Sequence, residues 1–429
     1  MTPRSGQTRR VLLLATTTGY QTRMFAEAAA SLGIEVVYAT DRCDQLADPW
    51  RDGAIPVRFH EERRSVDAVL KALDARPVSG VLVVGDRPGV MAADITRQLG
   101  LPGHSPEAAG IARDKRLSRE RLKTAGLLVP DYFAVPTTID PSTLLSKVTF
   151  PAVVKPTVLS ASRGVIRADD ALSFVTAFGR VQRLLASNDI KELRDPGSDV
   201  IQIESYIPGP EYALEGILEH GVFHTLAIFD KPDPLEGPFF EESIYVTPSR
   251  VNVGTERQIK DVVERAAKAL GLHHGPLHAE CRVNSRGVYV LEVAARPIGG
   301  LCARALRFVK PGEPSIGLEQ LLLRHAVGEP VGEWLRESEA SAVMMIPIPR
   351  SGLFRGAAGV DEAKAVAGVD EVLITAKADQ HLLALPEGSS YLGFIFAHAP
   401  TPDGAEQAVR NAHACLRLTI DPWLDVVNR

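Results

Sequence analysis

Short apolar runs alternate with amphipathic stretches over the first hundred residues. The apolar runs lie at 11–15, 34–39 and 80–85, and helix-like stretches at 22–32 and 90–99 end before Gly33 and Gly100. Continuous apolar strands separated by helices are typical of a parallel sheet that is covered on both faces. The pattern therefore predicts that the chain begins with an α/β domain.

The pattern changes in the middle of the chain. From about 151 to 248, β-rich segments are joined by turns rich in Pro and Gly. The sequence Thr255-Glu256-Arg257-Gln258 then predicts a capping box that opens a helix, and Gly271 ends the helical spacing of apolar residues. A last α/β unit is predicted from residue 340 to the end.

One carboxylate interrupts a segment that otherwise looks buried. Residues 277–293, LHAECRVNSRGVYVLEV, predict two strands joined by a three-residue loop, Ser285-Arg286-Gly287, which has glycine at the left-handed position. This register sets Glu280 opposite Glu292. It also predicts one core face, made of Ala279, Cys281 and Val283 with Tyr289, Leu291 and Val293.

Two opposed glutamates repel each other unless a cation lies between them. Mg²⁺ bound by one or two carboxylates and by phosphate oxygens fits such a pair. Arg296 could then hold a phosphoryl or carboxylate oxygen, and Gly299-Gly300 allows close approach of the backbone. The alternative is a structural ion network of Glu280 with Arg282 or Arg296, and a four-residue loop would separate the two carboxylates.

Composition and charge narrow the class of protein. The 429 residues are too many for one simple core, and a net charge of −5 does not favour a nucleic-acid protein. The four cysteines are scattered without metal or redox spacing, which indicates a reducing compartment. The apolar start is too short for a membrane span, and the residues 16–19 predict a strand-to-helix turn rather than a leader. The histidines at 220, 224, 273, 274 and 278 lack ligand spacing, so most are expected at the surface or behind a site.

Three further segments, together with the hairpin, resemble the ATP-grasp superfamily. They are LGLPGHSPEAAGIARDKRLSRERLKTAGLLVPDY (99–132), PAVVKPTVLSASRGV (151–165) and IQIESYIPGPEYALEG (201–216). LEVAARPIGG looks most like the carboxylate–amine ligases typified by L-amino-acid (dipeptide) ligases. The resemblance implies a Rossmann-like pre-ATP-grasp domain at 1–105, an ATP-grasp domain at 106–339 with a lid at about 150–206, and a small C-terminal α/β lobe at 340–429.

The resemblance also implies roles for individual residues. It implies ATP, with Mg²⁺ or alternatively Mn²⁺ on Glu280 and Glu292, and Arg296 as the catalytic residue on the transferring phosphate. The implied ATP-binding residues are Lys115, Lys155, Ser160, Ser162, Gly164, Glu204, Ile207 and Glu211. The density of charged and aromatic residues at 229–250 suggests a substrate pocket wall, with substrate residues Lys231, Glu241, Glu242, Arg296, Gly299 and Gly300.

Simpler interpretations stand beside these roles. The basic stretch around Lys115 would also suit a solvated helix face, the 160–164 segment a surface turn, and the 229–250 segment a structured loop. Lys155 and Glu211 would suit charges at strand ends and edges. Ala294 occupies the position where many ATP-grasp enzymes carry a further metal ligand, Asn, so the number of metal ions stays open.

The resemblance implies a cytoplasmic ATP-dependent carboxylate–amine ligase that forms an amide or peptide bond through an acyl phosphate. Its partners would be a small carboxylate and an amine, both amino-acid-like, with neither nucleic acid nor membrane, and homodimers are common in the family. Two alternatives remain at this point. One is an ATP-grasp carboxylase or formyl-transfer enzyme that uses bicarbonate or formate, and the other is a nucleotide-binding module without catalysis.

Overall fold

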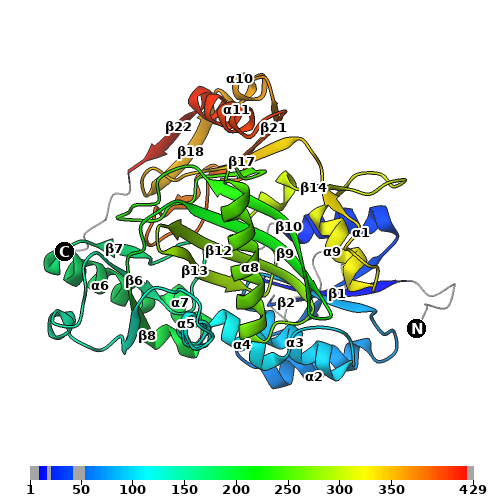
Figure 1. Cartoon of the computed structure of the whole chain (residues 1–429), viewed down its shortest axis with the longest axis horizontal. Helices are drawn as coiled ribbons and strands as arrows, with labels where there is room; N and C mark the ends of the chain where they lie inside the picture. Colours follow the sequence, from blue (N-terminus) through cyan, green and yellow to red (C-terminus); the bar gives the residue numbers. More distant parts are fainter. Residues whose placement is uncertain (1–8, 17–20, 42–53, 423–429) are drawn as a thin grey trace.

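A computed structural model describes residues 9–16, 21–41 and 54–422 of the chain. The first unit is a parallel sheet in the order β3-β2-β1-β4, as the apolar pattern predicted (Figure 1). Alternate residues of β1 face opposite layers: Val11 and Leu13 pack with Phe25, whereas Leu12 and Leu14 pack with Val66 and Met91. The elements are β1 (Arg10–Ala15), α1 (Gln21–Leu32), β2 (Glu35–Thr40), β3 (Ile55–Pro56), α2 (Glu62–Leu73), β4 (Gly80–Val84) and α3 (Gly89–Gln98). Cys43 and most of the predicted turn at 16–19 lie outside the described residues.

The second unit is an antiparallel sheet in the order β5-β8-β6-β7, backed by helix α6. The sequence pattern predicted only β-rich structure here, so α6 is a correction. Its apolar residues, including Phe174 and Phe178, recur with helical spacing, and Asp170 caps its first turn. The elements are α4 (Pro106–Arg113), α5 (Lys115–Thr124), β5 (Tyr132–Pro136), η1 (Pro141–Leu144), β6 (Ala152–Pro156), β7 (Ile166–Ala168), α6 (Ala171–Leu185), α7 (Asn188–Leu193), η2 (Pro196–Asp199) and β8 (Val200–Ser205).

A large sheet in the order β13-β12-β9-β10-β11-β17-β21-β19 forms the centre of the molecule. Helix α8 covers one of its faces through Ile259, Val263 and Leu270. The side chain of Asn252 caps this helix, so the predicted capping box at Thr255 is wrong, while Gly271 ends the helix as predicted. The elements are β9 (Glu211–Glu219), β10 (Val222–Lys231), β11 (Ile244–Thr247), α8 (Val253–Leu270), β12 (Gly275–Asn284) and β13 (Gly287–Ala294).

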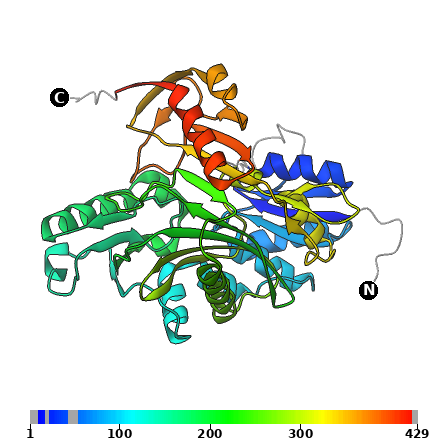
Figure 2. The same cartoon turned by 45° about the horizontal axis from the view of Figure 1, so that its top comes forward.

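The C-terminal part of the chain extends the same sheet through β17, β21 and β19, and its β20, β18 and β22 form a separate small sheet. β17 (Ala340–Ile346) pairs with β11, and helix α11 (Pro402–Cys415) packs on β17 and β21. Figure 2 shows this part above the central sheet, with the second unit and the N-terminal unit on either side. The remaining elements are η3 (Cys302–Ala305), β14 (Arg307–Val309), β15 (Ile316–Gly317), α9 (Leu318–Ala326), β16 (Leu335–Arg336), β18 (Gly352–Ala358), α10 (Val360–Lys364), β19 (Val369–Ile374), β20 (His381–Leu382), β21 (Gly393–Ala399) and β22 (Arg417–Asp421). Each helix among the described residues is too short or too polar to span a bilayer.

Candidate active site

A cleft with a volume of about 340 Å³ lies where the four parts of the chain meet. It brings together residues that are far apart in the sequence, from Thr16 to Tyr391. Three of the predicted site residues, Gly164, Lys231 and Glu241, are not among those that line it. The predicted residues that do line it are Lys115, Lys155, Ser160, Ser162, Glu204, Ile207, Glu211, Glu242, Glu280, Glu292, Arg296, Gly299 and Gly300.

The β12–β13 hairpin sets Glu280 directly opposite Glu292, but it does so by a different route from the predicted one. Asn284 pairs with Gly287, so the loop is the two residues Ser285 and Arg286, and the predicted three-residue loop is wrong. A β-bulge then inserts Leu291, because Cys281 pairs with Val290 while Glu280 pairs with Glu292. The shorter turn and the extra residue compensate, and both carboxylates line the cleft.

The bulge also changes which residues of β13 are in the core. Val288, Val290 and Val293 pack with Ala279 and Cys281 under helix α8. Tyr289, also predicted in the core, is buried but lies outside that cluster, and Leu291 lines the cleft instead. The predicted face is therefore correct for β12 and for Val293, but Val288 and Val290 take the places that it gave to Tyr289 and Leu291.

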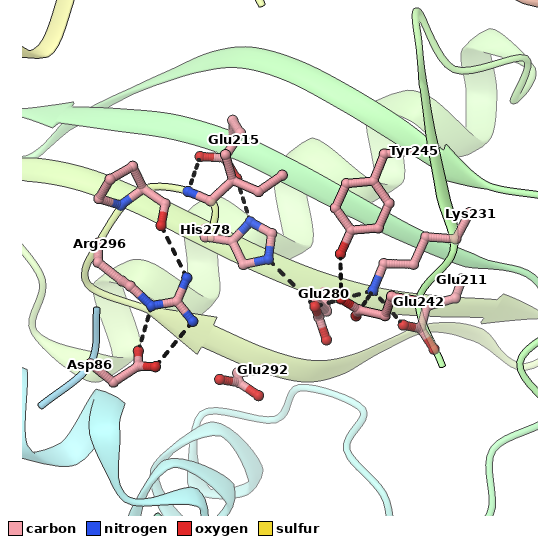
Figure 3. Close-up of polar contacts among 12 residues, drawn as sticks. Asp86, Glu211, Glu215, Lys231, Glu242, Tyr245, His278, Glu280, Glu292 and Arg296 are labelled. Atoms are coloured by element: carbon pink, nitrogen blue, oxygen red, sulfur yellow. Dashed lines mark hydrogen bonds and ion pairs between the residues drawn. The ribbon is translucent and has the colours of Figure 1, made fainter. Parts of the chain in front are cut away.

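A buried lysine occupies the centre of a carboxylate cluster (Figure 3). The Lys231 ammonium donates to Glu211 at 2.7 Å, to Glu242 at 2.6 Å and to Glu280 at 3.1 Å. Burial opposes its charge, but the three carboxylates raise the pKa of Lys231 well above its ordinary value. The cluster therefore requires a cation, and in this structure Lys231 provides one.

Glu242 and Glu280 differ in their protonation. Burial, with a smaller contribution from the charge of Glu280, raises the pKa of Glu242 to about 7 although Lys231 opposes the rise. The pKa of Glu280 lies well below its usual range because Lys231 and His278 outweigh its burial. The Tyr245 hydroxyl donates to Glu242 at 2.9 Å. Glu242 is thus the carboxylate of this cluster that can gain and lose a proton near neutral pH.

Arg296 forms a two-pronged ion pair with a residue that the sequence pattern did not single out. Its guanidinium donates to the Asp86 carboxylate at 2.7 and 3.1 Å (Figure 3). Burial opposes both charges, but each partner stabilises the other, so the pKa of Arg296 is raised and that of Asp86 is lowered. Asp86 follows Gly85 at the carboxyl end of β4, next to β1, where parallel sheets commonly bind ligands. That position was the signal in the sequence.

Lys155 and Glu204 form another buried pair that lines the cleft. Lys155 Nζ lies 2.6 Å from Glu204, and Arg119 donates to the same carboxylate at 2.8 Å. Burial lowers the pKa of Lys155 to about 8, whereas Arg119 and Lys155 outweigh burial and lower the pKa of Glu204 to about 2. Arg119 is 1% exposed, so the basic stretch around Lys115 is not a uniformly solvated helix face.

The segment after β6 folds over one wall of the cleft. Lys115 Nζ donates to the Leu159 carbonyl at 2.8 Å and lies 3.7 Å from Glu292. The Gly164 amide donates to the Pro386 carbonyl at 2.8 Å, so this glycine contacts the C-terminal part and not the cleft. Glu241 is half-buried beside the cleft, and burial raises its pKa.

His278 supports the site from behind. Its Nδ1 makes a short hydrogen bond with Glu215, and its Nε2 lies 3.4 Å from Glu280 (Figure 3). Burial disfavours the imidazolium, but Glu215 and then Glu280 raise the pKa of His278 to about 9. Glu215 also accepts the Ile298 amide at 3.1 Å, and the Gln21 side chain donates to the Ile298 carbonyl at 2.6 Å. Neither Glu215 nor Gln21 lies in a motif that pointed to a site.

The donor set fits a hard divalent cation. Within the described parts of the chain, one group of three carboxylates, Glu211, Glu242 and Glu280, has oxygens that all lie within 4.8 Å of one another. Oxygen ligands of this kind are those that Mg²⁺ and Mn²⁺ prefer. Glu292, predicted as a ligand with Glu280, is paired with it across the hairpin but does not belong to this group of three.

Comparison with protein families identifies three consecutive domains. Residues 26–103 match the ATP-grasp N-terminal domain, residues 148–305 the ATP-grasp domain, and residues 344–421 the L-amino acid ligase C-terminal domain 2. These matches follow the chain order that the sequence resemblance implied.

Individual relatives agree with the domain matches. The chain is 24% identical to the uncharacterized protein y4rH of Sinorhizobium fredii, over 99% of this chain and 86% of that protein. It is 28% identical to alanine–anticapsin ligase of Bacillus subtilis over 48% of this chain and 46% of that ligase, so the alignment spans about half of each. The crystal structure of L-amino acid ligase from Bacillus licheniformis superposes with a TM-score of 0.81 at 27% identity, covering 97% of this chain and all of that one.

Proposed function

We propose that this ATP-grasp ligase, whose chain resembles the L-amino acid ligases, joins a small carboxylate to an amine through an acyl phosphate. The supporting observation is one cleft that is lined by Lys155, Arg296 and the opposed Glu280 and Glu292 together. The match at 344–421 to an L-amino acid ligase domain favours an amino-acid substrate over bicarbonate or formate.

ATP would lie with its base toward the apolar end of the cleft, near Val153, Ile207 and Leu291. Lys155 and Lys115 would then contact phosphate oxygens. Lys155 can leave Glu204 for a phosphate without exposing a lone buried carboxylate, because Arg119 still neutralises Glu204. The Lys155–Glu204 pair would therefore act as a holding position for the lysine before ATP binds.

Mg²⁺ or Mn²⁺ would be held by Glu280 with Glu292 or with Glu211 and Glu242, and when bound it would neutralise charge on the transferring phosphate. Arg296 would bind the same phosphate as it passes to the substrate carboxylate. The carboxylate oxygen forms the new P–O bond as the bond to ADP breaks, so catalysis rests on position and charge.

The second step joins the amine to the acyl phosphate. The amine nitrogen attacks the acyl carbon, inorganic phosphate leaves, and one proton must leave the nitrogen. When Glu280 and Glu292 hold the ion, Glu242 would accept that proton, since a pKa of about 7 suits a general base at neutral pH. Arg296 and the Gly299–Gly300 backbone would stabilise the negative oxygen of the tetrahedral intermediate.

The test is to incubate the protein with ATP, Mg²⁺ and a matrix of amino acids and small carboxylates, while phosphate release and product mass are followed together. A product whose mass equals two substrates less water, formed with ADP and phosphate, supports the ligase. Phosphate release only with bicarbonate or formate would move the protein to the carboxylating or formylating type. ATP binding without turnover on any pair would contradict the proposed activity.

A further inference from the structure

The backbone of Ile298 is held on both sides by buried side chains from two different units. Its amide donates to Glu215 Oε2 at 3.1 Å, and its carbonyl accepts from Gln21 Nε2 at 2.6 Å. Glu215 belongs to β9 of the central sheet and is 1% exposed, while Gln21 begins α1 of the N-terminal unit and is 7% exposed. Ile298 itself lies in the short connection that leaves β13 at Ala294.

This connection carries the groups on which the proposed chemistry depends. Arg296 lies two residues before Ile298, and Gly299 and Gly300 follow it, and all of them line the cleft. A Cβ on Gly299 would meet nothing within 4 Å, so its backbone faces open space. Residues 295–301 belong to neither a helix nor a strand of the structure, so their geometry depends on contacts from other segments.

Glu215 is joined to the site by a second contact. Its other oxygen bonds His278 Nδ1, and His278 Nε2 points to Glu280 at 3.4 Å (Figure 3). One carboxylate therefore connects the strand that carries Glu280 with the segment that carries Arg296. Each oxygen of Glu215 therefore has one hydrogen-bond partner within the protein, a side chain for one oxygen and the main chain for the other.

We propose that Glu215 and Gln21 are positioning residues that fix the two peptide groups flanking the Ile298 Cα and thereby aim Arg296 and the Gly299–Gly300 amides at the carboxylate being activated. This inference rests on the proposed ligation. Its physical basis is that a buried amide or carbonyl without a partner is costly, so each of these two peptide groups adopts the orientation that satisfies its own hydrogen bond. Rotation of either peptide group would move the amides and guanidinium away from the reacting atoms, and errors of about 1 Å in such groups cost roughly 100-fold in rate.

The test compares variants that remove one hydrogen bond at a time. Gln21→Leu leaves the Ile298 carbonyl without its partner, and Glu215→Leu leaves the Ile298 amide without its partner. Glu215→Gln keeps an oxygen for the Ile298 amide, and its amide nitrogen can donate to His278 Nδ1 when that imidazole is neutral. The controls are Glu319→Leu, which removes a buried carboxylate of α9, and Gln320→Leu, which removes an amide that bonds Ser31 of α1 at 2.8 Å.

Hydrogen exchange at residues 296–300 gives a readout that does not depend on turnover. We expect Glu215→Leu and Gln21→Leu to speed exchange of these amides by about tenfold. In the ligation assay we expect kcat to fall by about 10- to 100-fold with KM for ATP within about twofold, as for groups that orient ligands from behind. Glu215→Gln should recover most of kcat, and both controls should resemble the wild type.

Unchanged exchange in both leucine variants would overturn the inference, and so would a fall in kcat no larger than in the controls. A rise in KM for ATP with kcat intact would also overturn it. If Glu215→Leu does not fold, Gln21→Leu decides the question, since it acts on the same residue through its carbonyl. Absence of ligation in the wild type would contradict the proposed function instead, and exchange would still decide whether the backbone at Ile298 is held as proposed.

Discussion

Arg296 of the central unit and Asp86 of the N-terminal unit meet through two hydrogen bonds of 2.7 and 3.1 Å across 210 positions of sequence. The pair holds the guanidinium at the cleft before any substrate is present. Forked pairs of this kind fix direction as well as charge. Asp86 therefore sets the resting position from which Arg296 would reach a phosphate.

We expect Asp86→Asn to lower activity and stability together. The asparagine amide has the shape of the carboxylate, but it offers the buried guanidinium only one accepting oxygen and no negative charge. This loss costs on the order of 2 kcal/mol. The melting temperature should fall by several degrees and kcat/KM by about tenfold or more. Asp94→Asn is the matched control, because the Asp94–Arg97 pair lies within one exposed helix turn. Equal effects at the two sites would contradict the role of Asp86.

Replacement of Arg296 by Lys separates charge from geometry. Lysine keeps the positive charge but cannot form the two parallel hydrogen bonds of arginine, so the ligation rate should fall by about 100-fold while ATP still binds.

Glu292→Ala should abolish ligation with the fold retained. Nucleotide binding by calorimetry, melting temperature and product mass check these expectations. Turnover at the wild-type rate in either variant would contradict the assigned roles.

Lys231 offers a test of the metal site that does not need turnover. Lys231→Met leaves Glu211, Glu242 and Glu280 without their shared cation, so the free energy of unfolding should fall by about 3 kcal/mol or more. Mg²⁺ should then raise the melting temperature of the variant more than that of the wild type, because the ion replaces the missing charge. Lys310→Met is the control, since Lys310 pairs with two carboxylates at the surface. A variant that Mg²⁺ stabilises no more than the wild type would argue against a cation site at these carboxylates.

Local patterns in the sequence predicted the parallel first sheet, the end of α8 at Gly271 and the opposition of Glu280 and Glu292. These features can be predicted from the spacing of apolar residues, because each depends on residues that are close together in the sequence. The hairpin shows the limit of such reasoning. A two-residue turn with a bulge and a three-residue turn without one give the same glutamate pair, but they place Tyr289 and Leu291 differently.

The supporting residues could not be found in the same way, because their partners are distant in sequence. Arg119 bonds the bulged Leu291 carbonyl and pairs with Glu204, although its helix reads as a basic surface. Glu215 sits in an apolar strand with no local sign of the Ile298 amide it will accept. Contacts between segments decide these roles, and only Asp86, at the end of a parallel strand, had a position that pointed to a site.

Two buried histidines predict opposite responses to pH. His325 is 2% exposed, and burial lowers its pKa to about 4, so the unfolded chain binds this proton more readily. The stability that neutral His325 contributes to the folded protein is complete above about pH 6.5 and is lost as the pH falls toward 4. The pKa of His278 is raised to about 9 by Glu215, against the effect of burial, so its contribution is complete below about pH 6.5 and is lost as the pH rises through 9.

In melting temperatures measured from about pH 5 to about pH 10, His325 should therefore contribute a decline on the acid side and His278 a decline on the alkaline side. His325→Gln should lessen the acid slope, and His278→Gln should lessen the alkaline slope, each by up to about 1.4 kcal/mol per pH unit. His381→Gln, which replaces an exposed histidine, is the surface control. An effect of His278→Gln on the acid side instead would mean that the imidazole is neutral in the folded protein. That result would contradict a charged pair between His278 and Glu215.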